Sequence, residues 1–320
     1  MTSYRRAGVD LEGAEAHVER IADVVTSTWG PNVVGSFGGF ASGITIPEDI
    51  RKPVLMMTTD GVGTKLDLAR RAGKWDGVGW DLVAMCVDDL VAAGARPLAM
   101  VDYMAVGRLD AERDRTIVAS IAEASAKAGA ALLGGETAEH PGVMDPDAVD
   151  LAGAALGVVE AGEELGPSRV TVGDVIIGLP SPNLRSNGFS LVREVFGEDV
   201  ENHFDLLLEP SVIYTPLVLE ATSTGAVRSA AHITGGGIPG NLPRALPEGT
   251  GAVIDTSTWE RPQVFDLIEE RGVPRDEMFR VFNMGIGFCL VVARDSAEEV
   301  LRLGGSLVGE VVAGSGVSLQ

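Results

Sequence analysis

Positive charge is scarce in this 320-residue sequence, where 25 Lys and Arg stand against 46 Asp and Glu and the formal net charge is −21. Proteins that bind nucleic acid present a basic surface, so this balance argues against nucleic acid as a partner. An acidic surface also repels a bare polyphosphate unless a metal cation mediates the contact. We therefore expect any phosphorylated ligand to arrive together with a cation.

Cysteine and long apolar runs are also scarce. The two cysteines, Cys86 and Cys289, both lie in apolar stretches, which predicts buried, reduced thiols and no disulfide framework. We find no run of about 18 apolar residues, and no basic segment followed by an apolar one near the start. The sequence therefore predicts a cytoplasmic protein with no membrane partner.

Strand-like and helix-like patterns alternate along the chain. Apolar runs predict strands at 53–59, 95–107, 130–139 and 150–160. Amphipathic or apolar stretches predict helices at 79–94 and 110–129, each ending at a glycine, and at 208–223. A polar stretch with Gly and Pro at 161–174 predicts a domain boundary. We expect a mixed α/β protein with two domains, residues 1–165 and 166–320.

The stretch TTDGVGTK at 58–65 follows a predicted strand. Gly61 and Gly63 let backbone N–H groups approach an anion, while Thr64 offers a hydroxyl and Lys65 a positive charge. Asp60 would repel a phosphate unless a divalent cation lies between them, and Mg²⁺ is commonly held by one or two carboxylates plus phosphate oxygens. The stretch is thus typical of a metal–nucleotide site, although an ordinary strand followed by a glycine turn has the same pattern.

Three acids interrupt the next, otherwise apolar helix. Asp81, Asp88 and Asp89 fall within one stripe of roughly 100° on a helical wheel. Buried carboxylates need cations or hydrogen-bond donors, so the stripe indicates metal binding or, alternatively, structural pairing. GGETAE at 134–139 repeats the combination of glycines followed by acids and adds Glu136 to the predicted metal ligands.

The second half of the chain carries glycine loops of a different character. Arg185, Ser186 and Asn187 precede a helix predicted at 189–196, and three glycines follow a strand predicted at 229–234, which ends at Thr234. Both arrangements are typical of helix N-terminal anion sites, which suit a sugar phosphate. His232 fits a hydrogen-bond donor or a core residue equally well. The residues alone thus favour an ATP-dependent phosphoryl-transfer or ligase reaction on a phosphorylated small molecule.

Eight stretches, in this order and spacing, closely resemble the phosphoribosylformylglycinamidine cyclo-ligase family, also called aminoimidazole ribonucleotide synthetases. They are AGVD (7–10), GSFGGF (35–40), TDGVGTKL (59–66), DLVAMCVDDLVAAGARPL (81–98), GGETAEHPG (134–142), SNGFSLVR (186–193), HITGGG (232–237) and FNMGIG (282–287). The resemblance implies an N-terminal domain that forms a dimeric β-barrel-like core in a homodimer. ATP would lie near that interface, and a C-terminal α/β domain would close over it.

The resemblance implies a reaction in which ATP phosphorylates the formyl amide oxygen of formylglycinamidine ribonucleotide. The amidine nitrogen then attacks this iminophosphate, and aminoimidazole ribonucleotide, ADP and phosphate are released. The implied cofactors are ATP and Mg²⁺, with K⁺ as a further cation. The implied metal ligands are Asp60, Asp88, Asp89 and Glu136, and the implied catalytic residues are Asp60, Lys65, Glu136 and Asn187. The implied cofactor-binding residues are Gly38, Gly39, Gly61, Gly63, Thr64, Lys65 and Asp81, and the implied substrate-binding residues are Arg185, Ser186, Asn187, His232, Thr234, Gly235, Gly236 and Gly237.

The second half departs from the family pattern. The family usually has His where this chain has Arg185, and P-T-R-[IL]-Y where residues 210–214 read PSVIY. The stretch after residue 193 is also shorter than in the family, and Asp88 stands where many members have Asn. Three functions therefore stay open: the purine-pathway cyclo-ligase, a paralogue that activates the amide of another compound, and a catalytically silent nucleotide-binding homologue.

Overall fold

The structure is a computed structural model, and it describes residues 11–320. The stretch AGVD at 7–10 lies outside the described residues. Two compact units emerge: residues 11–90 and 97–160 form the first, and Val91–Arg96 with Ala161–Gln320 form the second. The division into two domains, residues 1–165 and 166–320, remains a prediction.

The first unit contains an open four-stranded sheet with the strand order β3-β6-β4-β5. Strand β3 pairs antiparallel with β6, and β4 pairs parallel with β5. The expected barrel is therefore not closed within one chain, because β3 and β5 remain the two edges of an open sheet. The strands are β1 (Val33–Val34), β2 (Gly43–Ile44), β3 (Pro53–Gly61), β4 (Arg96–Val106), β5 (Ala131–Glu139) and β6 (Val149–Glu160), with β1 and β2 in a separate hairpin.

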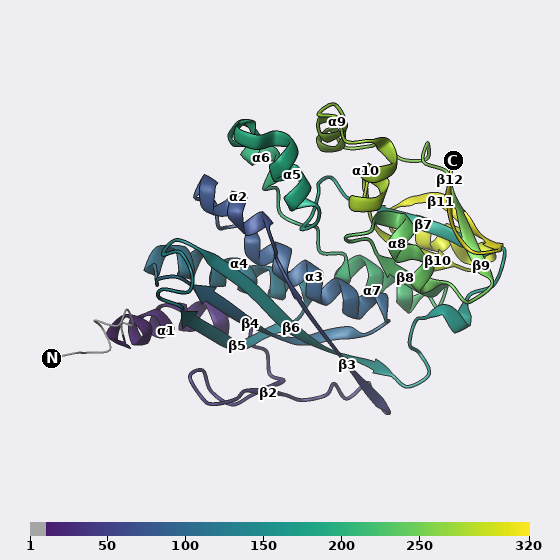
Figure 1. Cartoon of the computed structure of the whole chain (residues 1–320). Helices are drawn as coiled ribbons and strands as arrows, with labels where there is room; N and C mark the ends of the chain where they lie inside the picture. Colours follow the sequence, from purple (N-terminus) through teal and green to yellow (C-terminus); the bar gives the residue numbers. More distant parts are fainter. Residues whose placement is uncertain (1–10) are drawn as a thin grey trace. The chain divides into compact units, whose positions relative to one another are not determined.

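Helices lie on one side of this sheet, and the β1–β2 segment lies on the other (Figure 1). The helices are α1 (Leu11–Thr26), α2 (Lys65–Ala72), α3 (Val78–Ala92) and α4 (Ala111–Ala128). Helix α4 begins where the Asp110 carboxylate accepts hydrogen bonds from the N–H groups of Glu112 and Arg113, and it ends at Gly129 with a φ of 74°. Apolar side chains nevertheless remain exposed on the sheet, with Leu55 53%, Met57 75%, Val101 43% and Tyr103 43% accessible.

The second unit is built on a six-stranded sheet with the order β12-β9-β11-β7-β10-β8. All its pairings are antiparallel except β12 with β9. Neighbouring residues of one strand enter different core clusters, since Leu290 packs in one cluster and Cys289 in the other, so apolar layers cover both faces. The strands are β7 (Val175–Pro180), β8 (Val227–His232), β9 (Thr250–Ile254), β10 (Ile286–Val292), β11 (Ser306–Ala313) and β12 (Gly316–Leu319).

Seven helices accompany this sheet in the described part of the chain: α5 (Phe189–Phe196), α6 (Phe204–Leu207), α7 (Thr215–Ser223), α8 (Gly237–Asn241), α9 (Gln263–Glu269), α10 (Arg275–Val281) and α11 (Ala297–Leu301). The prediction of a helix at 208–223 was wrong for its first seven residues, because α7 begins only at Thr215. Between residues 11 and 320, no helix is long and apolar enough to cross a membrane.

Candidate functional site

The end of β3 presents Asp60 to solvent, just before a turn. Its Oδ1 accepts a hydrogen bond of 2.7 Å from the Gly61 N–H, which fixes the carboxylate close to its own backbone. Gly63 has a φ of 72°, a conformation that favours glycine, and Thr64 is the last residue before α2. Asp60, Gly63 and Thr64 are all exposed. The turn therefore offers a carboxylate, a hydroxyl and open backbone to a ligand.

Lys65 points away from this open face. Its ammonium group lies 2.9 Å from Oδ1 and 2.7 Å from Oδ2 of Asp81, and the two side chains are 1% and 0% exposed. Lys65 is the first residue of α2, and Asp81 lies in the first turn of α3. Two residues that the sequence analysis assigned to the nucleotide are thus joined in a buried ion pair.

Asp60 and Asp89 converge on the buried thiol of Cys86. The pKa of Cys86 is raised to about 12, mainly by burial and in part by the negative charges of Asp60 and Asp89. Cys86 itself lies against the Gly153 carbonyl at 3.6 Å, in the strand that pairs with β3. Asp88, the neighbour of Asp89 in α3, is fully buried. The end of β3 and the second half of α3 are therefore neighbours.

Glu136 lies on the opposite edge of the sheet. Asp60 is on β3 and is paired with Gly153, whereas Glu136 is on β5 and is paired with Tyr103. Two strands separate these edges, so in one chain the strands that carry the two acids lie three strand spacings, or about 14 Å, apart across the sheet. Consistent with this separation, no group of three or more His, Cys, Asp or Glu residues within 11–320 is arranged to hold a metal ion.

A cavity of about 1000 Å³ lies beside β5 in the first unit. Gly38, Gly39 and Glu136, which the sequence analysis assigned to the nucleotide or its metal, all line it, together with His17 and Asp102. The cavity brings the glycine loop at 35–40 to the edge of the sheet that carries Glu136, and its volume is within the range of small-molecule sites.

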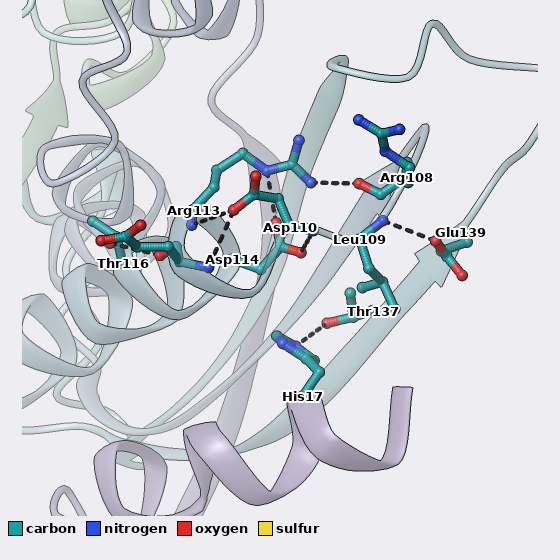
Figure 2. A network of polar contacts seen from close by, with 10 residues as sticks. His17, Arg108, Leu109, Asp110, Arg113, Asp114, Thr116, Thr137 and Glu139 are labelled. Atoms are coloured by element: carbon teal, nitrogen blue, oxygen red, sulfur yellow. Dashed lines mark hydrogen bonds and ion pairs between the residues drawn. The ribbon is translucent and has the colours of Figure 1, made fainter. Parts of the chain in front are cut away.

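The polar wall of this cavity comes from α1, β4 and β5. Figure 2 shows His17 of α1 next to Thr137 of β5, with Nε2 and Oγ1 3.2 Å apart, and Glu139 accepting a 2.8 Å hydrogen bond from the Leu109 N–H. Burial lowers the pKa of His17, which favours the neutral imidazole. Sequence reasoning missed His17, because a single histidine in an amphipathic helix carries no pattern.

Asp102 is the second residue that sequence reasoning missed. Its side chain is 9% exposed, and burial raises its pKa to about 7. A Cβ on Gly135 would lie 2.2 Å from Asp102 Oδ1, so only glycine at position 135 leaves room for this carboxyl group. The group is thus held at the cavity wall in an environment that favours its neutral form.

Asp102 is expected to make the protein less stable as the pH rises. The folded state retains the Asp102 proton up to about pH 7, whereas the unfolded chain loses it near the ordinary value of 3.8. Between these values the folded state binds more protons, so the free energy of unfolding falls as the pH rises. We expect Asp102→Asn to remove this slope and to stabilise the protein at pH 8 by roughly 2–4 kcal/mol. Urea unfolding of both proteins from pH 4.5 to pH 8 checks this, and parallel curves would contradict it.

The two glycine loops of the second unit approach each other. A Cβ on Gly235 would lie 3.8 Å from Nδ2 of Asn187, so the loop before α5 and the loop after β8 meet. Ser186 is 8% exposed, and its Oγ has no hydrogen-bond partner among the described residues. This buried hydroxyl precedes α5 by three residues, where N–H groups at a helix start favour an anion.

Asn241 organises the loop at 234–237, and sequence reasoning missed it. Its Nδ2 donates to the carbonyls of Thr234, Gly235 and Gly237 at 3.3, 3.2 and 2.9 Å. Gly236 and Gly237 have φ values of 102° and 58°, and a Cβ on Gly237 would lie 2.0 Å from the Phe279 carbonyl oxygen. Gly236 and Gly237 are therefore required for the backbone conformation of this loop. His232, in contrast, is 5% exposed and stacks on Phe288, as the alternative of a core role anticipated.

Arg185 lies in the interior of the second unit. Its side chain is fully buried, its guanidinium stacks over the Tyr214 ring at 4.8 Å, and Nη1 donates to the Gly287 carbonyl at 3.3 Å. The backbone N–H of Arg185 donates to Asn183 Oδ1 at 2.9 Å, and its φ is 60°. The structure therefore gives Arg185 packing contacts that support the loop carrying Ser186 and Asn187.

Replacing Arg185 is therefore expected to affect stability more than ligand contacts. Arg185→Ala removes the contacts with Tyr214 and Gly287 and leaves a cavity, which costs about 2–4 kcal/mol. Arg280→Ala is the matched control, because the Arg280 side chain is 76% exposed. Urea denaturation measures both variants. An unchanged midpoint for Arg185→Ala, with a raised KM for substrate, would instead make Arg185 a substrate contact.

Comparison with known proteins identifies both halves of the chain. Residues 48–159 match the family model "AIR synthase related protein, N-terminal domain", and residues 171–320 match "AIR synthase related protein, C-terminal domain". The chain belongs to the AIR synthase related superfamily. The resemblance found in the sequence is thus confirmed at the level of the superfamily, while the specific cyclo-ligase reaction is not decided by these matches.

Solved structures share this fold at low sequence identity. Thiamine-monophosphate kinase from Stenotrophomonas maltophilia is 19% identical, with a TM-score of 0.70 over 94% of this chain and 96% of that one. Hydrogenase maturation protein HypE in complex with ATP is 17% identical, with a TM-score of 0.69 over 92% of this chain and 86% of that one. T. maritima PurL complexed with AMPPCP is 14% identical, with a TM-score of 0.60 over 97% of this chain and 48% of that one. This chain spans about half of the PurL chain, and these likenesses concern the fold alone.

Proposed function

We propose that this protein is an ATP-dependent enzyme that closes the imidazole ring of formylglycinamidine ribonucleotide to give aminoimidazole ribonucleotide. The observation that carries the proposal is the placement of two kinds of site on two units. The first unit has an exposed carboxylate turn beside α3, and the second has the Ser186–Asn187 loop against the loop at 234–237. The ordered run of family motifs supports the choice of substrate.

The nucleotide site requires two copies of the chain in this proposal. Strands β3 and β5 are the two edges of the sheet, and edge strands favour pairing with another chain. The exposed apolar residues Leu55, Met57, Val101 and Tyr103 give such a pairing an apolar face to bury. Pairing the β3 edge of one copy with the β5 edge of a second places Asp60 of one copy beside Glu136 and the 1000 Å³ cavity of the other. The homodimer would thereby close the sheet into the barrel-like core.

The carboxylates fit a magnesium ion. Asp60 and Asp89 converge near Cys86 and offer hard oxygen ligands, and Mg²⁺ is commonly bound through one or two carboxylates plus the phosphates of a substrate. Asp60 and Asp89 would hold Mg²⁺ from one copy, and Glu136 would add a carboxylate from the other. When bound, the ion would neutralise charge on the transferred phosphate. K⁺ remains an expectation from the family resemblance.

The residues of the chain then act by positioning. The backbone around Gly61 and Gly63 receives the phosphates of ATP and directs the γ-phosphate toward the formyl amide oxygen. Phosphorylation makes this oxygen a good leaving group, since an amide oxygen is a poor one and phosphate is a good one. The amidine nitrogen attacks the same carbon, the ring closes, and phosphate departs. In the second unit, Ser186, Asn187 and the loop at 234–237 would hold the ribonucleotide phosphate.

A second candidate function is favoured by one observation. Arg185 stands where the family usually has His, so this position offers no imidazole for proton transfer. The Arg185 side chain is instead buried against Tyr214. A paralogue that activates the amide of a different compound would fit this change.

One assay separates the two candidates. ATP hydrolysis is measured with Mg²⁺, with and without formylglycinamidine ribonucleotide, while aminoimidazole ribonucleotide is followed as product. Release of ADP that depends on this substrate and matches aminoimidazole formation supports the cyclo-ligase. Nucleotide binding without turnover of this substrate contradicts the cyclo-ligase and favours the paralogue.

A further inference from the structure

The ion pair of Lys65 with Asp81 is almost completely buried. The Nζ atom lies within 2.9 Å of both carboxylate oxygens, and neither side chain is more than 1% exposed. The ion pair of Arg70 with Asp67 on the same helix is more accessible, since its side chains are 36% and 28% exposed. Lys65 and Asp81 are therefore held away from the solvent-facing side of the turn.

A buried ion pair contributes little net stability, because the cost of removing two charges from water offsets most of their attraction. An apolar pair of similar volume often stabilises a protein as well or better. What an ion pair adds is one defined geometry, since its two partners tolerate no other arrangement in the interior. The pair therefore indicates a requirement for a fixed distance between the two helices that carry it.

These two helices carry the two parts of the proposed nucleotide site. Lys65 directly follows the turn at 61–64, in which Gly63 and Thr64 are exposed, as is Asp60 before it. Asp81 lies in α3, two helical turns before Asp88 and Asp89. Cys86 of α3 lies 3.6 Å from the Gly153 carbonyl oxygen, and Gly153 pairs with Asp60 across β3 and β6, so the end of β3 and this part of α3 are neighbours. The ion pair braces the same two elements from their buried side.

The geometry points to Lys65 and Asp81 as positioning residues that set the phosphate-binding turn against the carboxylates of α3, rather than as contacts of the phosphate. This inference rests on the proposed function and deepens it, since it changes how the turn recognises ATP. The charge of Lys65 is directed to Asp81, so the phosphates are received by backbone N–H groups, Thr64 and a metal ion. Nucleotide binding is therefore expected to depend strongly on Mg²⁺.

A double-variant experiment on the full-length chain tests this inference. Lys65→Met leaves Asp81 buried without its partner, whereas Lys65→Met combined with Asp81→Leu replaces the whole pair with apolar side chains. Arg70→Met is the matched control, because Arg70 lies on the same helix and forms a partly exposed ion pair with Asp67. The readouts are the melting temperature and the Kd for Mg·ATP and for ATP without metal, measured well below each melting temperature.

We expect Lys65→Met to lower the melting temperature and to weaken Mg·ATP binding by about 10- to 100-fold, as for supporting residues of metal sites. The double variant is expected to regain most of both, and the control to match the wild type. A double variant that binds Mg·ATP as weakly as Lys65→Met, despite a restored melting temperature, would show a direct phosphate contact and overturn the inference. Lys65→Met with an unchanged Kd would leave only a structural role and overturn it as well. A wild-type protein that binds no nucleotide fails before any substitution is made and would overturn the proposed function together with the inference.

Discussion

Asp60→Asn is expected to abolish ATP turnover, with a loss of about 100-fold or more, while the protein stays folded. Asp60 is exposed, and its Oδ1 accepts a hydrogen bond from the neighbouring Gly61 N–H. The side-chain oxygen of an asparagine can accept the same hydrogen bond. The substitution therefore removes the charge that attracts a cation and leaves the local hydrogen bond in place. ADP release in the presence of substrate measures the effect.

The control for Asp60→Asn is a measurement of stability on the same sample. The melting temperature is expected to stay within about 2 °C of the wild type, since exposed substitutions rarely change stability much. Turnover near the wild-type rate would refute the assignment of Asp60 to a metal site. A large fall in melting temperature would instead assign Asp60 a structural role.

Glu136→Gln is expected to lower turnover by a similar factor, although in one chain the strand that carries Glu136 lies about 14 Å across the sheet from the strand that carries Asp60. Glu136 is exposed and lines the cavity that also contains Gly38 and Gly39. The proposed second copy brings this residue to the phosphates bound by the first. Substrate-dependent ADP release checks this as well, and Glu123→Gln on the exposed face of α4 is the control. Normal turnover by Glu136→Gln would remove the β5 edge from the site.

Much of the first unit could be predicted from the sequence, because its elements have clear local boundaries. The helix expected at 79–94 is α3, which ends two residues before Gly94, and Gly94 has a φ of 84°. The helix expected at 110–129 is α4, whose N-cap is Asp110. The strand expected at 95–107 is β4, Arg96–Val106. In each case a glycine or a capping residue marks the end, and apolar periodicity fixes the middle.

The helix expected at 208–223 shows where local pattern was overruled. Pro210 cannot donate within a helix, and its carbonyl accepts a hydrogen bond from Asn183, which holds this segment against the loop before α5. The helix instead begins at Thr215 with Pro216 in its first turn, a position where proline is favourable. Since Asn183 lies 27 residues away in the chain, no local pattern could reveal this contact.

The site residues were predictable by type but not by partner. The acids and glycines of the turn at 58–65 stood out because their chemistry is unusual at the end of a strand. The partner of Lys65 did not, because Asp81 lies 16 residues further on, in a separate helix. Asp102 and Asn241 were missed for the same reason, since their roles depend on Gly135 and on the loop at 234–237, which only the folded chain brings near them.

In the proposed homodimer, two copies of the chain share each nucleotide site. This sharing is tested most directly by co-expressing Asp60→Asn and Glu136→Gln, each inactive alone, and measuring the activity of the purified mixture. Random pairing makes half of the dimers mixed, and each mixed dimer has one site with both native acids. Since one of the two sites in each mixed dimer is complete, the mixture is expected to recover up to about a quarter of the wild-type activity. A mixture of confirmed mixed dimers that stays as inactive as its two parents would contradict it.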